Sequence, residues 1–231
     1  MTHRALREAR RYLLGALLLE LALNVVGVRS RGRALAVGVA ATLLLFRDPD
    51  RPLDPTAGEV YAAADGTVVR VDRVQDAWIS GREALRVSTF LSLHNVHVTR
   101  SPVAGVVTAE EDVSGPFRPA FVPGAEENSR RRLAIDGPAG RVVVVQAAGL
   151  VARRIAAWVG VGDELVAGQP LGLIHLGSRT DVLLPEGAAE ACVQRGQRVR
   201  AGQTPIARYR GALTGALRDA AVRDREAEAV L

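Results

Sequence analysis

Ser178 and a few histidines are the residues of this 231-residue chain whose types and neighbours suggest nucleophilic chemistry. Ser178 follows Gly177 between the apolar runs LGLIHL and DVLLP, which are typical of buried strands. A serine hydroxyl is a weak nucleophile unless a histidine takes its proton and a carboxylate orients that histidine. His97 in LHNVHVTRSP and Asp65 in ADGTV could complete such a set. The glycine-serine step could instead be a plain turn, or a bond that the protein itself cuts.

The surroundings of these residues argue against several familiar sites. Ser178 lies outside a G-x-S-x-G elbow, which disfavours an ordinary α/β hydrolase. His94 and His97 are three residues apart, but no third ligand cluster accompanies them, so we expect no metal site. On a regular strand their side chains point to opposite faces, and they could share a pocket only across a bend. We expect His175 to be a strand residue with a satisfied hydrogen bond.

Composition narrows the chemistry further. All 30 basic residues are arginine, because the chain contains no lysine. A chain without lysine cannot hold pyridoxal phosphate through a lysine Schiff base, nor carry biotin or lipoate on lysine. The single Cys192 excludes an intramolecular disulfide and is typical of a reducing compartment. The formal net charge is +5, but the arginines do not alternate with aromatic residues, so we expect no nucleic-acid partner.

Residues 1–46 form a basic leader with two apolar runs, 12–28 and 34–46, separated by RSRGR. A membrane span needs about 20 apolar residues, and the first run contains Glu20 and Asn24. A cleavable signal peptide and a two-span hairpin both fit poorly. We therefore predict an uncleaved anchor that dips into or lies along the cytoplasmic side of the cell membrane, with its arginines at anionic head groups. A pair of buried core helices is the alternative.

The rest of the chain is predicted to be mainly β. A proline-rich linker over 47–59 leads into a β domain over 60–210, and 211–231 is a charged, helix-prone tail. GDELVAGQPLGLI, from Gly162, and GQRVRAGQTPIAR, from Gly196, form an internal repeat. Glycine pairs at this spacing suit the sharp hairpins of barrel-sandwich-hybrid domains. We expect such a β core with an N-terminal apolar helical membrane anchor, α+β overall.

Six blocks of the chain resemble the phosphatidylserine decarboxylase proenzymes of the short bacterial and archaeal type. They are FRDPDR, ADGTV, LHNVHVTRSPVAG, VVVVQAAGLVARRIAAWV, GDELVAGQPLGLI and LGSRTDVLLP, in the same order and spacing. The resemblance spans Phe46 to Pro185 and implies that the chain cuts its own Gly177–Ser178 bond. Ser178 would become a covalently bound pyruvoyl group, the pyruvate cofactor, and cleavage would leave a β chain of 1–177 and an α chain of 178–231.

The resemblance also assigns roles to side chains. The processing triad of the family maps onto Asp65, His97 and Ser178, and His94 matches a histidine that the family uses around decarboxylation. We predict His94 to be the acid that protonates the carbanion left by loss of carbon dioxide. The pyruvoyl group would form a Schiff base with the substrate amine and act as the electron sink, which agrees with the absence of lysine.

The implied reaction converts phosphatidylserine to phosphatidylethanolamine at a membrane surface, as part of phospholipid biosynthesis. Phe117 and Phe121 are candidates for contacts with the lipid, and a homo-oligomer is possible. Two departures bear on substrate preference and cleavage rate: Ser129 stands where the family has an acidic residue, and His175 stands where arginine is more usual. The rival hypotheses are an unprocessed Asp-His-Ser serine hydrolase and a non-catalytic membrane-anchored barrel protein.

Overall fold

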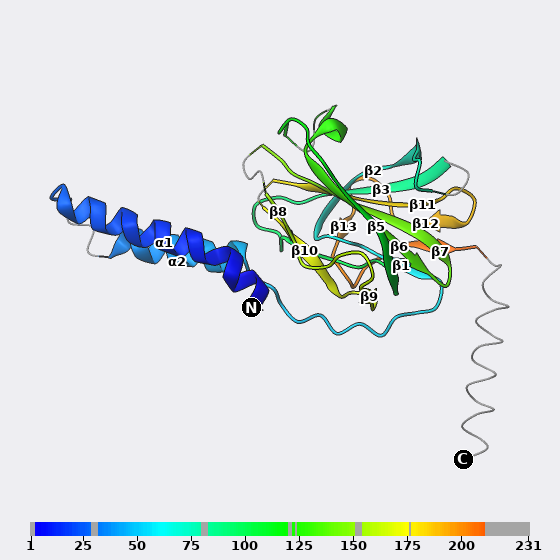
Figure 1. The fold of residues 1–231 in the computed structure, drawn as a ribbon, viewed down its shortest axis with the longest axis horizontal. Coiled ribbons are helices and arrows are strands. Elements are labelled where there is room, and N and C mark those ends of the chain that lie inside the picture. The colour runs from blue at the N-terminus through cyan, green and yellow to red at the C-terminus, as the bar shows by residue number, and fades with distance from the viewer. Residues whose placement is uncertain are drawn as a thin grey trace, which may run out of the picture.

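The computed structural model describes residues 3–28, 32–79, 83–119, 122, 124–150, 154–175 and 177–210. Helices α1 (His3–Val25) and α2 (Arg33–Leu45) precede a body of antiparallel strands and one short 3-10 helix, η1 (Ala125–Glu127) (Figure 1). The prediction of a mainly β protein is confirmed. The predicted charged tail, 211–231, lies outside the described residues.

The strands form one large sheet and two small ones. They are β1 (Glu59–Tyr61), β2 (Gly66–Gln75), β3 (Glu83–Phe90), β4 (Val98–Arg100), β5 (Gly105–Val113), β6 (Arg130–Gly137), β7 (Gly140–Ala147), β8 (Ile155–Ala157), β9 (Glu164–Leu165), β10 (Pro170–Ile174), β11 (Arg179–Pro185), β12 (Ala189–Ala191), β13 (Arg198–Val199) and β14 (Pro205–Tyr209). The eight-stranded sheet, in the order β13-β2-β3-β11-β7-β6-β5-β9, is strongly curled. The small sheets have the orders β1-β14-β12 and β4-β10-β8.

The core lies on the inner face of the curled sheet. Val182 of β11 is directly opposite Val87 of β3 and Val144 of β7, and all three side chains are buried. They belong to one apolar cluster with Val60 and Ile206 of the first small sheet. Because side chains alternate along a strand, the runs of valine and leucine around β7 and β11 supply the apolar face that closes this core.

The internal repeat forms two turns that touch. Gly162, Gly168, Gly196 and Gly202 all have positive φ, from +66° to +94°, which glycine adopts without strain. A Cβ on Gly202 would lie 3.0 Å from the Cα of Gly168, so the second glycine of each copy packs against its counterpart. The shared spacing of the two copies therefore has two causes, the left-handed backbone and this close contact.

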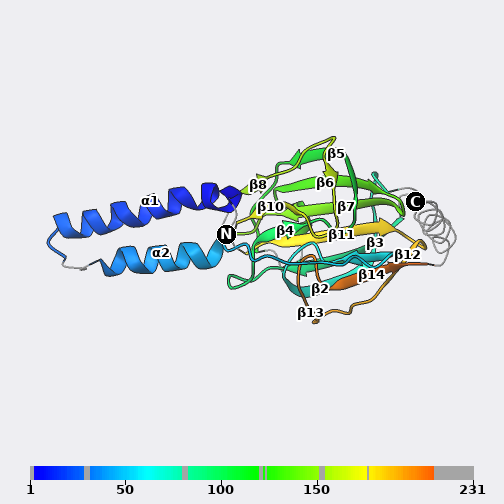
Figure 2. The same cartoon turned by 90° about the horizontal axis from the view of Figure 1, so that it is seen from below.

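The two helices pack side by side as a hairpin that projects away from the β body (Figure 2). They approach closely at small residues, since a Cβ on Gly38 would lie 2.5 Å from the Cβ of Ala16. The buried carboxylate of Glu20 accepts hydrogen bonds from the backbone N–H groups of Gly32 (2.8 Å) and Leu35 (3.2 Å). Glu20 thus satisfies N–H groups at the start of α2, where a negative charge is favourable.

Beyond the exposed arginines at the start of α1, the hairpin exposes large apolar side chains. Leu18, Val25, Val26 and Val37 are 64%, 88%, 75% and 69% exposed. These side chains do not enter the β core, so the alternative of two buried core helices is wrong. Among the described residues, neither helix combines the length and the apolar character that crossing a membrane requires.

Candidate active site

The register of the large sheet brings two of the three predicted triad residues, Asp65 and Ser178, to one of its ends. Thr67 of β2 pairs with Phe90 of β3, which pairs with Arg179 of β11. Asp65 and Ser178 immediately precede β2 and β11, so they lie at this same end with one strand between them. Adjacent strands are about 4.8 Å apart, so about 10 Å separates the two backbones.

Ser178 is fully buried at this end of the sheet. Its carbonyl oxygen accepts a hydrogen bond of 2.9 Å from the N–H of Leu91, but its hydroxyl has no partner among the described residues. Gly177, just before it, has a left-handed φ of +74°. A buried hydroxyl without a partner is unfavourable for stability, and its position directly after Gly177 makes it a candidate nucleophile.

His97 is also buried, at 1% exposure, and immediately precedes β4. Burial, together with the positive charge of Arg47, lowers the pKa of His97 to about 4, although the backbone of Asn95 and the charge of Asp65 oppose this shift. The imidazole is therefore neutral at neutral pH and can accept a proton. Neither ring nitrogen is hydrogen-bonded within the described residues, so the structure does not join His97 to Asp65 or Ser178 by a hydrogen bond.

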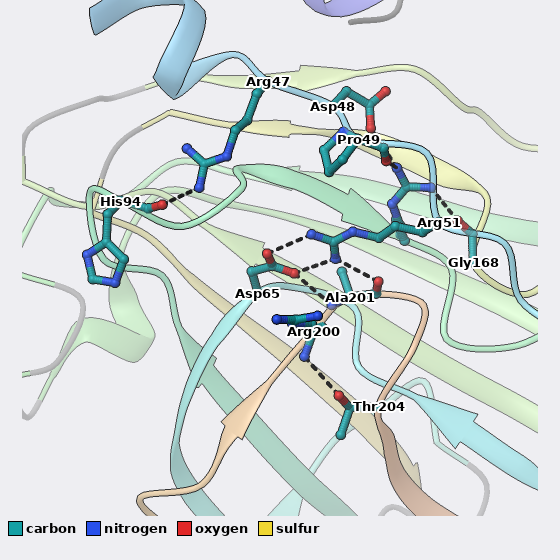
Figure 3. Close-up of polar contacts among 11 residues, drawn as sticks. Arg47, Asp48, Pro49, Arg51, Asp65, His94, Gly168, Arg200, Ala201 and Thr204 are labelled. Atoms are coloured by element: carbon teal, nitrogen blue, oxygen red, sulfur yellow. Dashed lines mark hydrogen bonds and ion pairs between the residues drawn. The ribbon is translucent and has the colours of Figure 1, made fainter.

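Asp65 is instead paired with an arginine (Figure 3). The Arg51 guanidinium donates to both carboxylate oxygens, at 2.5 and 2.7 Å, and the N–H of Ala201 donates to one of them at 2.8 Å. Arg51 also donates to the carbonyl oxygen of Ala201 at 2.8 Å. The carboxylate thus carries a negative charge close to His97 without touching it.

Sequence reasoning did not single out Arg51, because the segment 47–59 was expected to be a linker. Asp48 in this segment pairs with Arg100 at 2.6 Å, and Arg100 also donates to the carbonyl oxygens of Pro49 and Gly168, both at 3.0 Å. The sequence did contain a feature that could have indicated these ion pairs. The FRDPDR block has four charged residues close together, more than a segment that only connects two domains requires.

His94 has other contacts than the predicted triad residues. It is exposed, and its ring lies 3.2 Å from the hydroxyl of Ser92, while its carbonyl oxygen accepts a hydrogen bond from Arg47 (Figure 3). These contacts of His94 do not include Ser178, so its role as an acid stays a prediction. Phe117 is half-buried, and Phe121 lies outside the described residues.

His175 connects the site to α1. It is buried one residue beyond the end of β10, and its Nδ1 lies 2.9 Å from the hydroxyl of Tyr12, so the expected hydrogen bond is present. Burial and the charges of Arg11 and Arg154 lower its pKa to about 4. A cavity of about 20 Å³ lies between His175, His97, Tyr12 and neighbouring apolar side chains, which is room for about one water molecule. The base of the hairpin therefore covers the His97 side of the site.

Comparison with known proteins shows the family of the chain. Residues 40–207 match the family described as phosphatidylserine decarboxylase. The chain is 45% identical to the phosphatidylserine decarboxylase proenzyme of Thermobifida fusca over 186 residues, which cover 79% of this chain and 81% of the relative. It is 47% identical over 178 residues to the proenzyme of the same name from Symbiobacterium thermophilum, covering 76% and 82% of the two chains.

A third relative, the phosphatidylserine decarboxylase proenzyme of Nitrosomonas eutropha, is 45% identical over 181 residues, covering 77% of this chain and 83% of the relative. The match to the family includes Asp65, His97 and Ser178, and it runs from within α2 to within β14. The chain belongs to the phosphatidylserine decarboxylase family.

Proposed function

We propose that this chain is a self-processing carboxy-lyase that converts phosphatidylserine to phosphatidylethanolamine, using a pyruvoyl group made from its own Ser178. One observation carries the proposal beyond family membership. A fully buried Ser178 hydroxyl, without a partner among the described residues, directly follows Gly177 at the sheet end that also holds Asp65, whose charge acts on the buried His97. A buried serine hydroxyl is normally hydrogen-bonded, so a purely structural role in a turn does not explain why this hydroxyl is buried without a partner.

Cleavage needs no reagent other than the chain and one water molecule. The Ser178 hydroxyl passes its proton to His97, and its Oγ bonds to the carbonyl carbon of Gly177. The carbon–nitrogen bond between the two residues breaks, and the nitrogen takes up the proton, so an ester replaces the amide. Loss of the Ser178 α-proton then expels Gly177 as a carboxylate, and water releases ammonia and leaves the ketone.

Each side chain at the site has a part in this scheme. His97 can act as the base because burial keeps its imidazole neutral, with a pKa of about 4. The Asp65 carboxylate, fixed by Arg51, favours the protonated imidazole electrostatically once the proton has moved.

The surroundings of Ser178 fit a small carbonyl group that works away from bulk water. Gln146 and Thr180 are direct partners on β7 and β11, both buried. The Gln146 amide donates to the hydroxyl of Thr99 at 2.5 Å, which leaves its Oε1 and the Thr180 hydroxyl without partners among the described residues. When bound, the pyruvoyl group supplies an electron sink for the electrons released with carbon dioxide. The free polar atoms of Gln146 and Thr180 are available to orient a polar head group.

We also propose that the helical hairpin holds the enzyme on the cytoplasmic side of the cell membrane. Its exposed apolar side chains would enter the acyl boundary, while the arginines of the leader and of the segment between the helices meet anionic head groups. The contact between the glycine turns at Gly168 and Gly202 supports the proposal that the β body has a barrel-sandwich-hybrid-like core. The contact between Tyr12 and His175 would then keep the site close to the lipid surface.

The first experiment is the intact mass of the purified protein under denaturing conditions, beside Ser178→Ala. We expect two chains split after Gly177, with the smaller one reactive toward a hydrazine only in the wild type, and carbon dioxide release from phosphatidylserine in detergent micelles. An intact wild-type chain that a fluorophosphonate labels at Ser178 would instead indicate the serine hydrolase. An intact, unlabelled and inactive chain would indicate the non-catalytic barrel.

A further inference from the structure

Gly149 packs directly against the carbonyl group of Gly177. A Cβ added to Gly149 would lie 1.7 Å from the carbonyl oxygen of Gly177 and 2.7 Å from its carbonyl carbon. Since a Cβ lies about 1.5 Å from its Cα, the Cα of Gly149 is within about 3.2 Å of that oxygen. This is the carbonyl group that Ser178 would attack.

Backbone torsion does not explain a glycine at this position. Gly149 is absent from the glycines with positive φ, so other residues could adopt its backbone conformation. Gly177 differs, because its φ of +74° is a conformation that glycine favours. Gly149 is therefore required by the contact alone, and any side chain there would have to displace the peptide between Gly177 and Ser178.

The chain on the other side of this contact is fixed. Asn128 is fully buried, and its amide nitrogen donates to the carbonyl oxygen of Ala148, the residue before Gly149, at 2.9 Å. The N–H of Ala148 donates to the carbonyl oxygen of Ser129 at 2.9 Å. Both polar groups of Ala148 are thus bound, so Gly149 approaches Gly177 from a rigid position. Asn128 is itself held, because its Oδ1 accepts a hydrogen bond of 3.0 Å from the N–H of Arg118.

We propose that Gly149, held by Asn128, is a positioning residue for self-cleavage, which rests on the function proposed above. Glycine has a wide choice of backbone conformations, and contact with Gly149 restrains the plane of the Gly177 carbonyl group. That restraint keeps the carbonyl carbon facing the Ser178 hydroxyl while the Oγ–carbon bond forms and the carbon–nitrogen bond breaks. Gly149 donates and accepts no proton in this step and acts only through the placement of the Gly177 carbonyl.

The test compares Gly149→Ala with Gly105→Ala. Gly105 is a matched control, since a Cβ there would lie 2.5 Å from the carbonyl oxygen of Asp136, also backbone against backbone and also without positive φ. It lies at the opposite end of the sheet, where β5 meets the end of β6. The measurements are the rate of cleavage by intact mass after cell-free synthesis, and the thermal unfolding of each variant in a Ser178→Ala background.

We expect Gly149→Ala to slow cleavage by about 100-fold, the usual consequence of an ångström-scale misplacement, while Gly105→Ala cleaves at the wild-type rate with a similar loss of thermal stability. Hydroxylamine splits an ester but not an amide, so it should not hasten cleavage of Gly149→Ala, whose defect precedes the ester. Cooling should restore cleavage to a variant that is merely unstable, but not to Gly149→Ala.

If Gly149→Ala does not fold, Asn128→Ser tests the same link without adding atoms near Gly177, and we expect it to slow cleavage as well. Near-wild-type cleavage of Gly149→Ala, or equal slowing by Gly105→Ala, would overturn the proposal and leave the decarboxylase function standing. A wild-type chain that never cleaves would overturn both.

Discussion

The Asp65 carboxylate is bound at both oxygens by the guanidinium of Arg51, 14 positions earlier in the chain. Both side chains are nearly buried, at 12% and 7% exposure. The pair connects the segment after the helical hairpin to the sheet end that carries Ser178. It also fixes a negative charge near His97 in a region from which water is largely excluded.

Removing Arg51 should therefore damage both stability and cleavage. Arg51→Leu leaves the Asp65 carboxylate buried without its partner, which costs roughly 3–5 kcal/mol. Urea unfolding in a Ser178→Ala background measures the loss of stability, and intact mass measures slower cleavage in the native background. Arg208→Leu is the control, because the arginine of the ion pair between Arg208 and Glu59 (2.8 Å) is 64% exposed, so solvent screens the pair and its loss should change stability little. Equal losses for the two variants would contradict this account.

The pH dependence of cleavage follows from the pKa of His97. The base must be neutral to accept the Ser178 proton, and burial lowers the pKa of His97 to about 4. The cleavage rate should stay level from neutral pH downwards and fall only as the pH passes through about 4. Rates of chain splitting in buffers across this range provide the measurement. A fall centred near the ordinary histidine value of 6.5 would mean that another group is the base.

Stability should also depend on pH in the same range. The pKa values of His97 and His175 are about 4 in the folded chain, against 6.5 for an ordinary histidine. Between these values the unfolded chain binds protons that the folded chain does not, so stability is full above 6.5 and is lost as the pH falls towards 4. For His97 the loss is at most about 3 kcal/mol. The urea midpoint of Ser178→Ala, followed against pH, should show this slope, and adding His175→Gln should reduce it.

The apolar surface of the hairpin should control membrane binding. Val25→Asp or Leu18→Asp places a charge where we expect acyl chains, and binding to vesicles of phosphatidylglycerol and phosphatidylcholine should weaken about tenfold or more, since each tenfold corresponds to about 1.4 kcal/mol. Val161→Asp is the control, because Val161 is 59% exposed but belongs to the β body. Sedimentation with vesicles gives the comparison. Equal binding by all three variants would contradict the hypothesis that the hairpin binds the membrane.

Local sequence patterns were sufficient for part of this picture. Alternating valines predicted strands, and the repeated glycines predicted turns that the structure shows with positive φ in both copies. The apolar runs predicted helices outside the β domain, but the charge of Glu20 within the first run argued against insertion of that run into a membrane. In the structure its carboxylate is enclosed by the hairpin and satisfies the start of α2. Sequence could not reveal this, because the partners of a charge depend on how two helices cross.

The motifs and their order along the chain predicted Asp65, His97 and the Gly177–Ser178 bond as parts of the site. This was possible because residue types and chain neighbours can be read from the sequence. The partners of these residues were decided only by the tertiary structure. Arg51 reaches Asp65, and Gly149 reaches Gly177, because the register of the curled sheet and the path of the chain around it bring distant segments together. Such contacts depend on which residues face each other across strands, and no local pattern encodes that.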